Sequence, residues 1–349
     1  MIKTKVMTDI LKQVAGIDVA QKELVVSLGK IDKSLEAEVY RCKTFANKLS
    51  GFKAMLVWVN KHATEQVPVR YVMEATGVYH ESLAYYLSDQ GLESSIVLPN
   101  KISNYVKTLD EKSITDKTAS AAICKFGLER KLEVWQKPKR VFKTLKQLTR
   151  ERDQLIAERT FLKNQLHAEQ AEAEPSEDSI IRMKARIALV NTQEVEIRSE
   201  IAAIIKQDAK LMKEVQTITS IPGIGKLTAV TVLAETNGFE LIRNKKQLVS
   251  YSGLDVKVKD SGTSVKSKPR ISKKGNRHLR KAMHMPALTA IRHDERFKSI
   301  FVRLVSKHGI KMKAAVAVQR KLLEMIYIIW KTNKPYDIQY QQKKDSIAI

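Results

Sequence analysis

The sequence is poor in cysteine, in long apolar runs and in acidic residues. Cys42 and Cys124 are its only cysteines and lie far apart, which excludes a disulfide framework or a cysteine metal site and favours two reduced, buried thiols. The best apolar run, residues 322–330, is shorter than the roughly 18 to 20 residues of a membrane span and contains Glu324. The first residues show no apolar secretory segment. We therefore expect a cytoplasmic protein without membrane contact.

The shortage of acidic residues gives the chain a strong positive charge. Lys and Arg total 62 against 38 Asp and Glu, so the 349 residues carry a formal charge of +24. Hydrophobic residues make up 43% of the chain, an ordinary globular share that excludes wholesale disorder. An excess of this size attracts polyanions, of which nucleic acid is the commonest in a cell and a membrane surface the weaker alternative.

The first part of the sequence, residues 1–135, predicts an α/β domain. Residues 14–28 predict two strands around a polar turn, and residues 39–45 supply a third. Further strands are expected at residues 69–74 and 94–99, and helices at 47–62, from about 79 to 90, and across 101–128. Three strands followed by alternating strands and helices is the order of the ribonuclease H-like fold.

The middle of the sequence, residues 136–216, predicts a coiled-coil helical hairpin. Glycine is absent between residues 141 and 215, and Pro175 is the only proline there, at the expected bend. Apolar residues recur about every 3.5 positions. Such a hairpin either packs on itself as a spacer or acts as a dimerisation arm. The predicted core positions are Val141, Leu145, Leu148, Arg152, Leu155, Arg159, Leu162 and Leu166 in the first arm, and Ile180, Met183, Ile187, Val190, Glu194, Ile197, Ile201, Ile204, Asp208, Leu211 and Val215 in the second.

The last part predicts a mainly helical domain over residues 217–335, followed by a tail at 336–349. The text IPGIG from Ile221 to Gly225 is typical of a helix-hairpin-helix-like element, whose glycines let backbone amides approach a phosphate, or of a plain tight turn. Residues 261–281 contain eight cations and no acid, which favours contact with a nucleic-acid backbone. The expected nucleic-acid-binding residues are Gly223, Gly225, Lys226, Lys266, Lys268, Arg270, Lys273, Lys274, Arg277, Arg280 and Lys281.

Three acidic residues stand where a carboxylate is costly unless it binds something. Asp18 interrupts an apolar strand, Glu74 ends another, and Asp116 begins a helical segment. Each alone is more often a surface residue. Together, in this strand order, they favour a site for Mg²⁺ or Mn²⁺, because such ions prefer carboxylate oxygens and assist phosphoryl chemistry on nucleic acids.

The serines ahead of the basic run are candidates for a nucleophile. Ser261 and Ser264 lie in a polar, glycine-containing loop, and spacing alone leaves them equal. A nucleophilic serine needs its proton removed, and the neighbouring sequence offers cations but no base. His278 and His284 are six residues apart, which does not suit metal binding from one helix face.

These motifs resemble a known family. The segments GIDVAQKELVV, YVMEATGVYHESLAYYL, TDKTAS, SIPGIGKLTAVTVLAE and LVSYSGLDVKVKDSGTSVKSKPRISKKGNRHLRKAMH are similar, in this order, to insertion-sequence transposases that join a RuvC-like DEDD domain to a C-terminal serine-containing transposase domain. These are the bridge-RNA-guided recombinases. The resemblance covers nearly the whole chain.

The resemblance implies an activity and a set of partners. It implies that Asp18, Glu74 and Asp116 bind metal and that Ser261 attacks a DNA phosphodiester to form a covalent phosphoserine. It also implies a guide RNA that pairs with donor and target DNA, and a homodimer that assembles into a homotetramer with a composite site between subunits.

The sequence departs from the family pattern at one position. The family has a second Asp three residues after the third acid, and here that residue is Ala119. Three acids suffice, or Asp110, Glu111 or Ser120 with a water completes the set, or this copy is impaired. The alternative functions are therefore a metal-dependent structure-selective endonuclease and a nucleic-acid-binding protein without catalysis.

Overall fold

The computed structural model describes residues 10–109, 113, 115–240, 242–258, 260–261, 265–266 and 270–339. The chain divides into two compact units, Met1–Lys137 and Pro138–Ile349, which are described separately. Within the described ranges, no helix is both long and apolar enough to cross a membrane.

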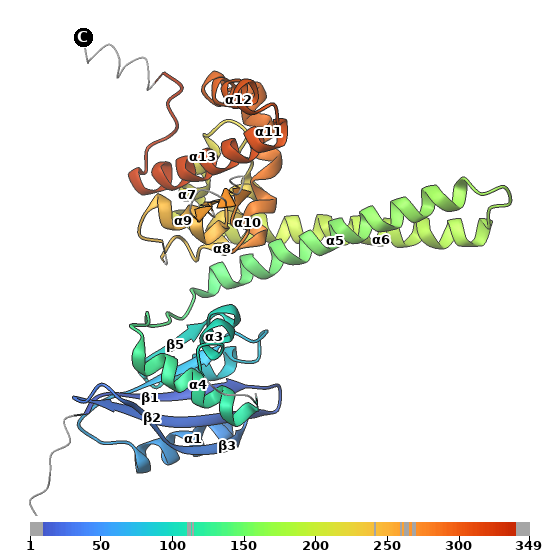
Figure 1. Cartoon of the computed structure of the whole chain (residues 1–349). Coiled ribbons are helices and arrows are strands. Elements are labelled where there is room, and N and C mark those ends of the chain that lie inside the picture. Colours follow the sequence, from blue (N-terminus) through green and yellow to red (C-terminus); the bar gives the residue numbers. More distant parts are fainter. Residues whose placement is uncertain are drawn as a thin grey trace, which may run out of the picture. The chain divides into compact units, whose positions relative to one another are not determined.

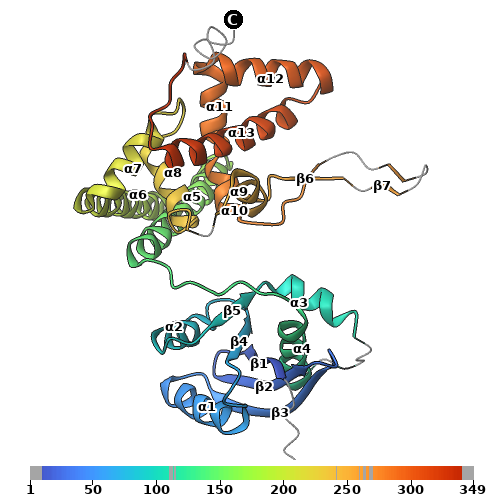
Figure 2. The same cartoon turned by 90° about the vertical axis from the view of Figure 1, so that its left-hand side faces the viewer.

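The first unit is built on a five-stranded mixed sheet (Figures 1 and 2). Its strands are β1 (Ile10–Val19), β2 (Glu23–Asp32), β3 (Ala37–Ala46), β4 (Val69–Glu74) and β5 (Ser94–Val97). They lie in the order β3-β2-β1-β4-β5; β1, β2 and β3 pair antiparallel, whereas β4 runs parallel to both β1 and β5. This topology is the predicted ribonuclease H-like fold.

Helices cover both faces of this sheet, and each face has its own apolar core. The helices are α1 (Leu49–His62), α2 (Glu81–Asp89), α3 (Pro99–Val106) and α4 (Asp116–Glu129). Phe52 of α1 and Leu83 of α2 pack with Ile17 and Met73 on one face. Ile123 and other residues of α4 pack with Val14 and Val72 on the opposite face. Figure 1 shows α1 and α4 on the two sides of the sheet.

Close packing fixes α4 on the sheet. A side chain at Gly16 of β1 would stand 2.2 Å from the Cys124 backbone nitrogen, so only glycine allows this approach. At the far end of α4, the Lys12 ammonium donates to the carbonyls of Gly127, Leu128 and Arg130. The sequence predicted one helical stretch over 101–128, but the helix is interrupted, and α4 begins anew at Asp116 with Thr115 and Thr118 forming a capping box.

The second unit is mainly helical. Its helices are α5 (Arg140–Gln170), α6 (Glu177–Gln207), α7 (Ala209–Thr219), α8 (Lys226–Glu235), α9 (Lys245–Ser252), α10 (Arg277–Ala282), α11 (His284–His293), α12 (Glu295–His308) and α13 (Lys311–Thr332). Four two-residue strands, β6 (Val256–Lys257), β7 (Asp260–Ser261), β8 (Val265–Lys266) and β9 (Arg270–Ile271), pair as β6-β9 and β7-β8.

The long helices α5 and α6 form an antiparallel hairpin that packs on itself and extends away from the other helices of this unit (Figure 1). The polar exceptions in its predicted seam meet one another: Glu194 accepts hydrogen bonds from Arg152 at 2.8 Å and from Arg159 at 2.6 Å. At the base, Leu145 and Ile201 join the core of the remaining helices. A second helix break occurs at Asp208, whose side chain caps α7.

Candidate active site

Two of the predicted acids lie side by side at the carboxyl ends of adjacent parallel strands. Ile17 of β1 pairs with Met73 of β4, so the next residues, Asp18 and Glu74, follow in the same register. Side chains alternate along a strand. Because Val14 and Val72 face α4, Asp18 and Glu74, an even number of residues further on, face the same side.

The third acid reaches this edge from α4. Asp116 is the first residue of that helix and is exposed, while the helix body crosses the same face of the sheet. A carboxylate in the first helical turn is favourable because it opposes the positive end of the helix dipole. The three acids therefore come from three elements to one edge of the sheet.

The charges of the three acids interact with one another. Burial raises the pKa of Asp18 above its ordinary value of 3.8, and the charges of Asp116 and then Glu74 raise it further; only the Val19 backbone amide opposes them. Like charges gathered in this way without a compensating cation cost free energy. A bound cation would remove that cost.

The donor chemistry of this cluster suits a hard divalent cation, since all the donors are carboxylate oxygens. Among the described residues, no three His, Cys, Asp or Glu side chains are grouped tightly enough to hold a metal ion as they stand. All three acids are at least partly exposed, and Thr76 donates a hydrogen bond to Glu74 at 3.2 Å.

The structure places two of the residues that are relevant to a fourth metal ligand. Ala119 follows Asp116 by one helical turn and offers no donor. The Ser120 hydroxyl, one of the candidates, is fully buried, lies 2.7 Å from that of Ser27 and donates to the Lys117 carbonyl at 2.9 Å. The first of these two hydrogen bonds links α4 to β2, and neither of them leads to the acids. Asp110 and Glu111 lie outside the described residues.

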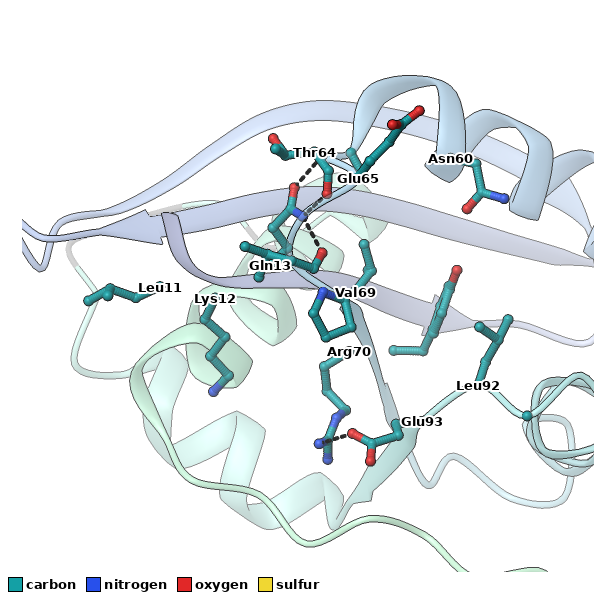
Figure 3. Close-up of a pocket in the computed structure, with 15 residues that line it drawn as sticks. Leu11, Lys12, Gln13, Asn60, Thr64, Glu65, Val69, Arg70, Leu92 and Glu93 are labelled. Atoms are coloured by element: carbon teal, nitrogen blue, oxygen red, sulfur yellow. Dashed lines mark hydrogen bonds and ion pairs between the residues drawn. The ribbon is translucent and has the colours of Figure 1, made fainter. Parts of the chain in front are cut away.

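A cavity of about 620 Å³ lies at the opposite end of β1 and β4 (Figure 3). Several of the polar groups that line it bond one another. The Gln13 side chain bonds Thr64 and Val67, and Arg70 forms an ion pair with Glu93. These contacts join strand starts to loops, and they indicate a structural role.

Ser261 lies in a strand rather than in the predicted loop. It belongs to β7, and its backbone pairs with Val265 of β8. Figure 2 shows β6 and β7 on an arm that extends away from the helices of the second unit. The competing candidate Ser264 lies outside the described residues.

The IPGIG turn has a packing role that the sequence left open. Gly223 adopts φ +89°, and a side chain there would stand 2.6 Å from the Pro286 carbonyl of α11. Gly225 precedes α8, is exposed, and has open space around it. Gly225 and Lys226, at the α8 N-terminus, are both exposed.

The predicted basic surface divides into exposed and internally bonded cations. Arg280 donates to the carbonyls of Ser252 at 2.7 Å and Gly275 at 3.2 Å, and Lys281 pairs with Asp153. Among the described cations of this segment, Arg270, Lys273, Lys274, Arg277 and Lys281 are exposed, so Lys281 is both exposed and paired. The side chains of Lys266 and Lys268 lie outside the described residues.

Sequence reasoning missed a buried acid that supports the basic segment. Glu235 ends α8 with a fully buried side chain, held by two hydrogen bonds from Arg150 of α5 and one from Asn276. Burial alone would raise the pKa of Glu235, but these hydrogen bonds lower it. Asn276 also caps α10, so the network ties the hairpin to the start of that basic helix. Glu235 ends an apolar run just as Glu74 does, and this pattern in the sequence could have identified it as a buried acid.

A ribonuclease H-like sheet with carboxylates at one edge, joined to a cation-rich helical unit, defines a protein that acts on nucleic acid. Two family models match the chain: a transposase model described by its DEDD domain over residues 15–170, and the Transposase IS116/IS110/IS902 family over residues 215–301. Together they cover more than half of the chain. The protein is a transposase of the IS110/IS116 family with a DEDD, RuvC-like domain.

The chain is also similar to individual known proteins. The chain is 29% identical over 300 residues to the pilin gene-inverting protein of Moraxella bovis, covering 84% of this chain and 90% of that protein. It is 24% identical over 292 residues to the transposase for insertion sequence element IS1111A of Coxiella burnetii, covering 76% and 78%. Among solved structures, T. thermophilus RuvC in complex with a Holliday junction substrate is 10% identical with a TM-score of 0.27, over 35% of this chain and 99% of that one.

Proposed function

We propose that the chain is an RNA-guided recombinase of an insertion sequence that cuts and rejoins DNA through a phosphoserine. The observation that carries this proposal is the gathering of Asp18, Glu74 and Asp116 at one sheet edge of a transposase whose other unit presents Ser261 on a basic arm. A relative named a gene-inverting protein supports it, because inverting a gene requires both cutting and rejoining.

The proposed chemistry balances as two phosphoryl transfers. The Ser261 Oγ bonds to phosphorus as the bond to a deoxyribose oxygen breaks; the serine proton passes to solvent, and the leaving oxygen takes up a proton. A hydroxyl of the other DNA strand then attacks the phosphoserine and frees the serine. Asp18, Glu74 and Asp116 would hold Mg²⁺ or Mn²⁺, which neutralises charge developing on the phosphate when bound. In this proposal, three carboxylates suffice despite Ala119.

The proposed partners are donor DNA, target DNA and a guide RNA. Base pairing of the RNA with both DNAs would choose the sites, and the formal charge of +24 would supply sequence-independent affinity. The proposed assembly is a homodimer that forms a homotetramer when two DNAs are joined, with the acids of one subunit meeting the serine of another. Light scattering that finds a monomer with and without nucleic acid would contradict this assembly.

Covalent trapping on a denaturing gel tests the mechanism. The protein, its element's end-derived RNA, donor and target DNA and Mg²⁺ should give a protein–DNA adduct. Ser261→Ala and Asp18→Ala should abolish the adduct and Ser264→Ala should retain it. Equal adduct from Ser261→Ala and Ser264→Ala would reject the assignment of the nucleophile.

A second candidate is a metal-dependent structure-selective endonuclease. The observation in its favour is that all three acids belong to the first unit, whose two cores contain no residue of the second. It predicts cut DNA with free ends and no adduct. RNA binding without cutting or adduct would instead identify a copy impaired at Ala119, and Ala119→Asp should then restore activity.

A further inference from the structure

A groove runs beside the carboxylates between α4 and the edge strand β3. Two adjoining cavities, of about 580 Å³ and about 570 Å³, share Cys42 and Lys117 in their walls. The first also contains Lys125, and the second contains Asp116. The groove therefore continues up to one of the three acids.

The strand register places this groove on the face that carries the acids. Asp18 of β1 pairs with Val25 of β2, which pairs with Thr44 of β3, and all three partners of such a row point to one face. Val25 and Thr44 line the cavity that contains Asp116. The row that begins at Asp18 thus ends at the groove.

The charge of the groove suits an anionic chain. Lys117 and Lys125 are exposed or half-buried cations eight residues apart on α4, with Ala121 between them on the same face. Eight residues of helix span about 12 Å, which corresponds to roughly three to four nucleotide steps of about 3.4 Å. Arg41 and Lys43 alternate with Cys42 along β3, so their side chains point to the other face of the sheet and the charge of the groove comes from the lysines of α4. The acids among its lining residues are Glu23 and Asp116, both at the end near the carboxylate cluster.

We propose that this groove, between Lys117 and Lys125 of α4 and Cys42 of β3, binds the phosphodiester backbone of a nucleic-acid strand and leads it to the carboxylates. The inference rests on the proposed function for the identity of the reaction, but binding in the groove does not require the reaction. The small residues Ala121 and Cys42 leave room for the strand, and the lysines contact its phosphates.

Cys42 is a native reporter in the wall of this groove. It is half-buried and free, whereas Cys124 is fully buried and burial raises its pKa to about 12. A thiol reacts as its thiolate, so only Cys42 should react readily with a maleimide at neutral pH. Peptide mapping by mass spectrometry measures its labelling rate in the full-length protein, and Cys124 supplies the internal control.

The test is protection of Cys42 by defined probes. Duplex DNA, single-stranded DNA and single-stranded RNA are added in turn, with polyglutamate as the polyanion control. We expect at least one nucleic acid to slow labelling about tenfold at low salt, with the effect lost at high salt, because phosphate contacts release counterions. The nucleic acid that protects Cys42 best identifies DNA or RNA as the strand in the groove.

Charge reversal supplies the matched variants. Lys117→Glu with Lys125→Glu should abolish protection and lower the slope of log affinity against log salt by about two, one for each lost phosphate contact. Lys53→Glu with Lys61→Glu makes the same change at the same spacing on α1, which covers the other face of the sheet, and should retain protection.

Several outcomes would overturn the proposal. They are unchanged Cys42 labelling while nucleic acid is bound, equal protection by polyglutamate, and full protection in the Lys117→Glu, Lys125→Glu protein. Protection that persists in Asp18→Ala and Ser261→Ala proteins supports the groove even where no covalent adduct forms. Failure of the groove and failure of the proposed chemistry are thus distinguishable.

Discussion

At the residue scale, Asp18 carries the largest electrostatic cost of the acid cluster. Its pKa is raised by burial and by the charges of Asp116 and Glu74, so the folded protein binds a proton more tightly there than the unfolded chain does. The stability contributed by this group is present below its ordinary pKa of 3.8 and is lost as pH rises through the folded value.

Asp18→Asn should therefore stabilise the metal-free protein at neutral pH. We expect a gain of about 0.5 to 1 kcal/mol, kept small because solvent screens this half-exposed group. Thermal unfolding in chelator, followed by circular dichroism at pH 4 and pH 7, measures it, and the gain should shrink at the lower pH. A loss of stability at pH 7 would show that the acids do not repel one another.

The stabilisation of the folded protein by Mg²⁺ should require the Asp18 carboxylate. A cation bound only by the folded state stabilises it, by about 2.7 kcal/mol at one hundred times the dissociation constant. We expect Mg²⁺ to raise the Tm of the wild-type protein and to leave that of Asp18→Ala unchanged. An equal rise in both proteins would place the metal elsewhere.

In the α5–α6 hairpin, Glu194 is an acid whose charge matters for stability. Burial alone would raise the pKa of Glu194, but its hydrogen bonds to Arg159 and Arg152 lower it, so its stabilising effect is present at neutral pH and is lost as pH falls through the folded value. Glu194→Ala should lower stability by about 1 to 2 kcal/mol, because it leaves two arginines in the seam without their partner. Glu196→Ala, exposed on the same helix, should change the unfolding midpoint little, and equal effects would contradict the pairing.

At the scale of elements, the strands of the first unit and most helices could be predicted because apolar periodicity and turn residues are local signals. The break between α3 and α4 was not predicted. The capping box of Thr115 and Thr118 is a local signal that was available, whereas the packing of Gly16 against Cys124 involves residues distant in sequence. The heptad pattern located the seam, but only the fold showed that Arg152, Arg159 and Glu194 compensate one another.

The candidate site could likewise be predicted only where its signals are local in the sequence. Interrupted apolar strands revealed Asp18 and Glu74, because an acid at such a position needs a reason. The groove at Lys117 and the buried Glu235 remained hidden, because each depends on contacts between elements far apart in the chain. The interpretation of both cysteines as buried was wrong for Cys42, which lies on an edge strand.

The turn at IPGIG allows a prediction about an element. Gly223→Ala should cost about 2 to 3 kcal/mol, because alanine is strained at positive φ and its Cβ would meet the α11 backbone. Gly225→Ala is the control, with open space and an ordinary φ of −86°. Chemical denaturation measures both, and weaker DNA binding by a fully stable Gly225→Ala protein would assign the phosphate contact to the α8 N-terminus.

At the scale of the whole molecule, each unit should fold on its own. The cores of the first unit contain only residues before 138, and the core of the second begins at Phe142. We expect a fragment of residues 1–137 to unfold cooperatively and to keep the Mg²⁺-dependent rise in Tm. A fragment without a thermal transition would show that the second unit is needed to complete the first.

The way the α5–α6 hairpin is rooted also has a practical consequence for building on this protein. Leu145 and Ile201 anchor its base in the second unit, so deleting the hairpin would open that core, whereas the bend between Gln170 and Glu177 lies at the far end and is solvent-exposed throughout. That bend is therefore a suitable position at which to attach a fluorophore or insert a domain. A reporter placed there would leave the base of the hairpin, and with it the core of the second unit, intact.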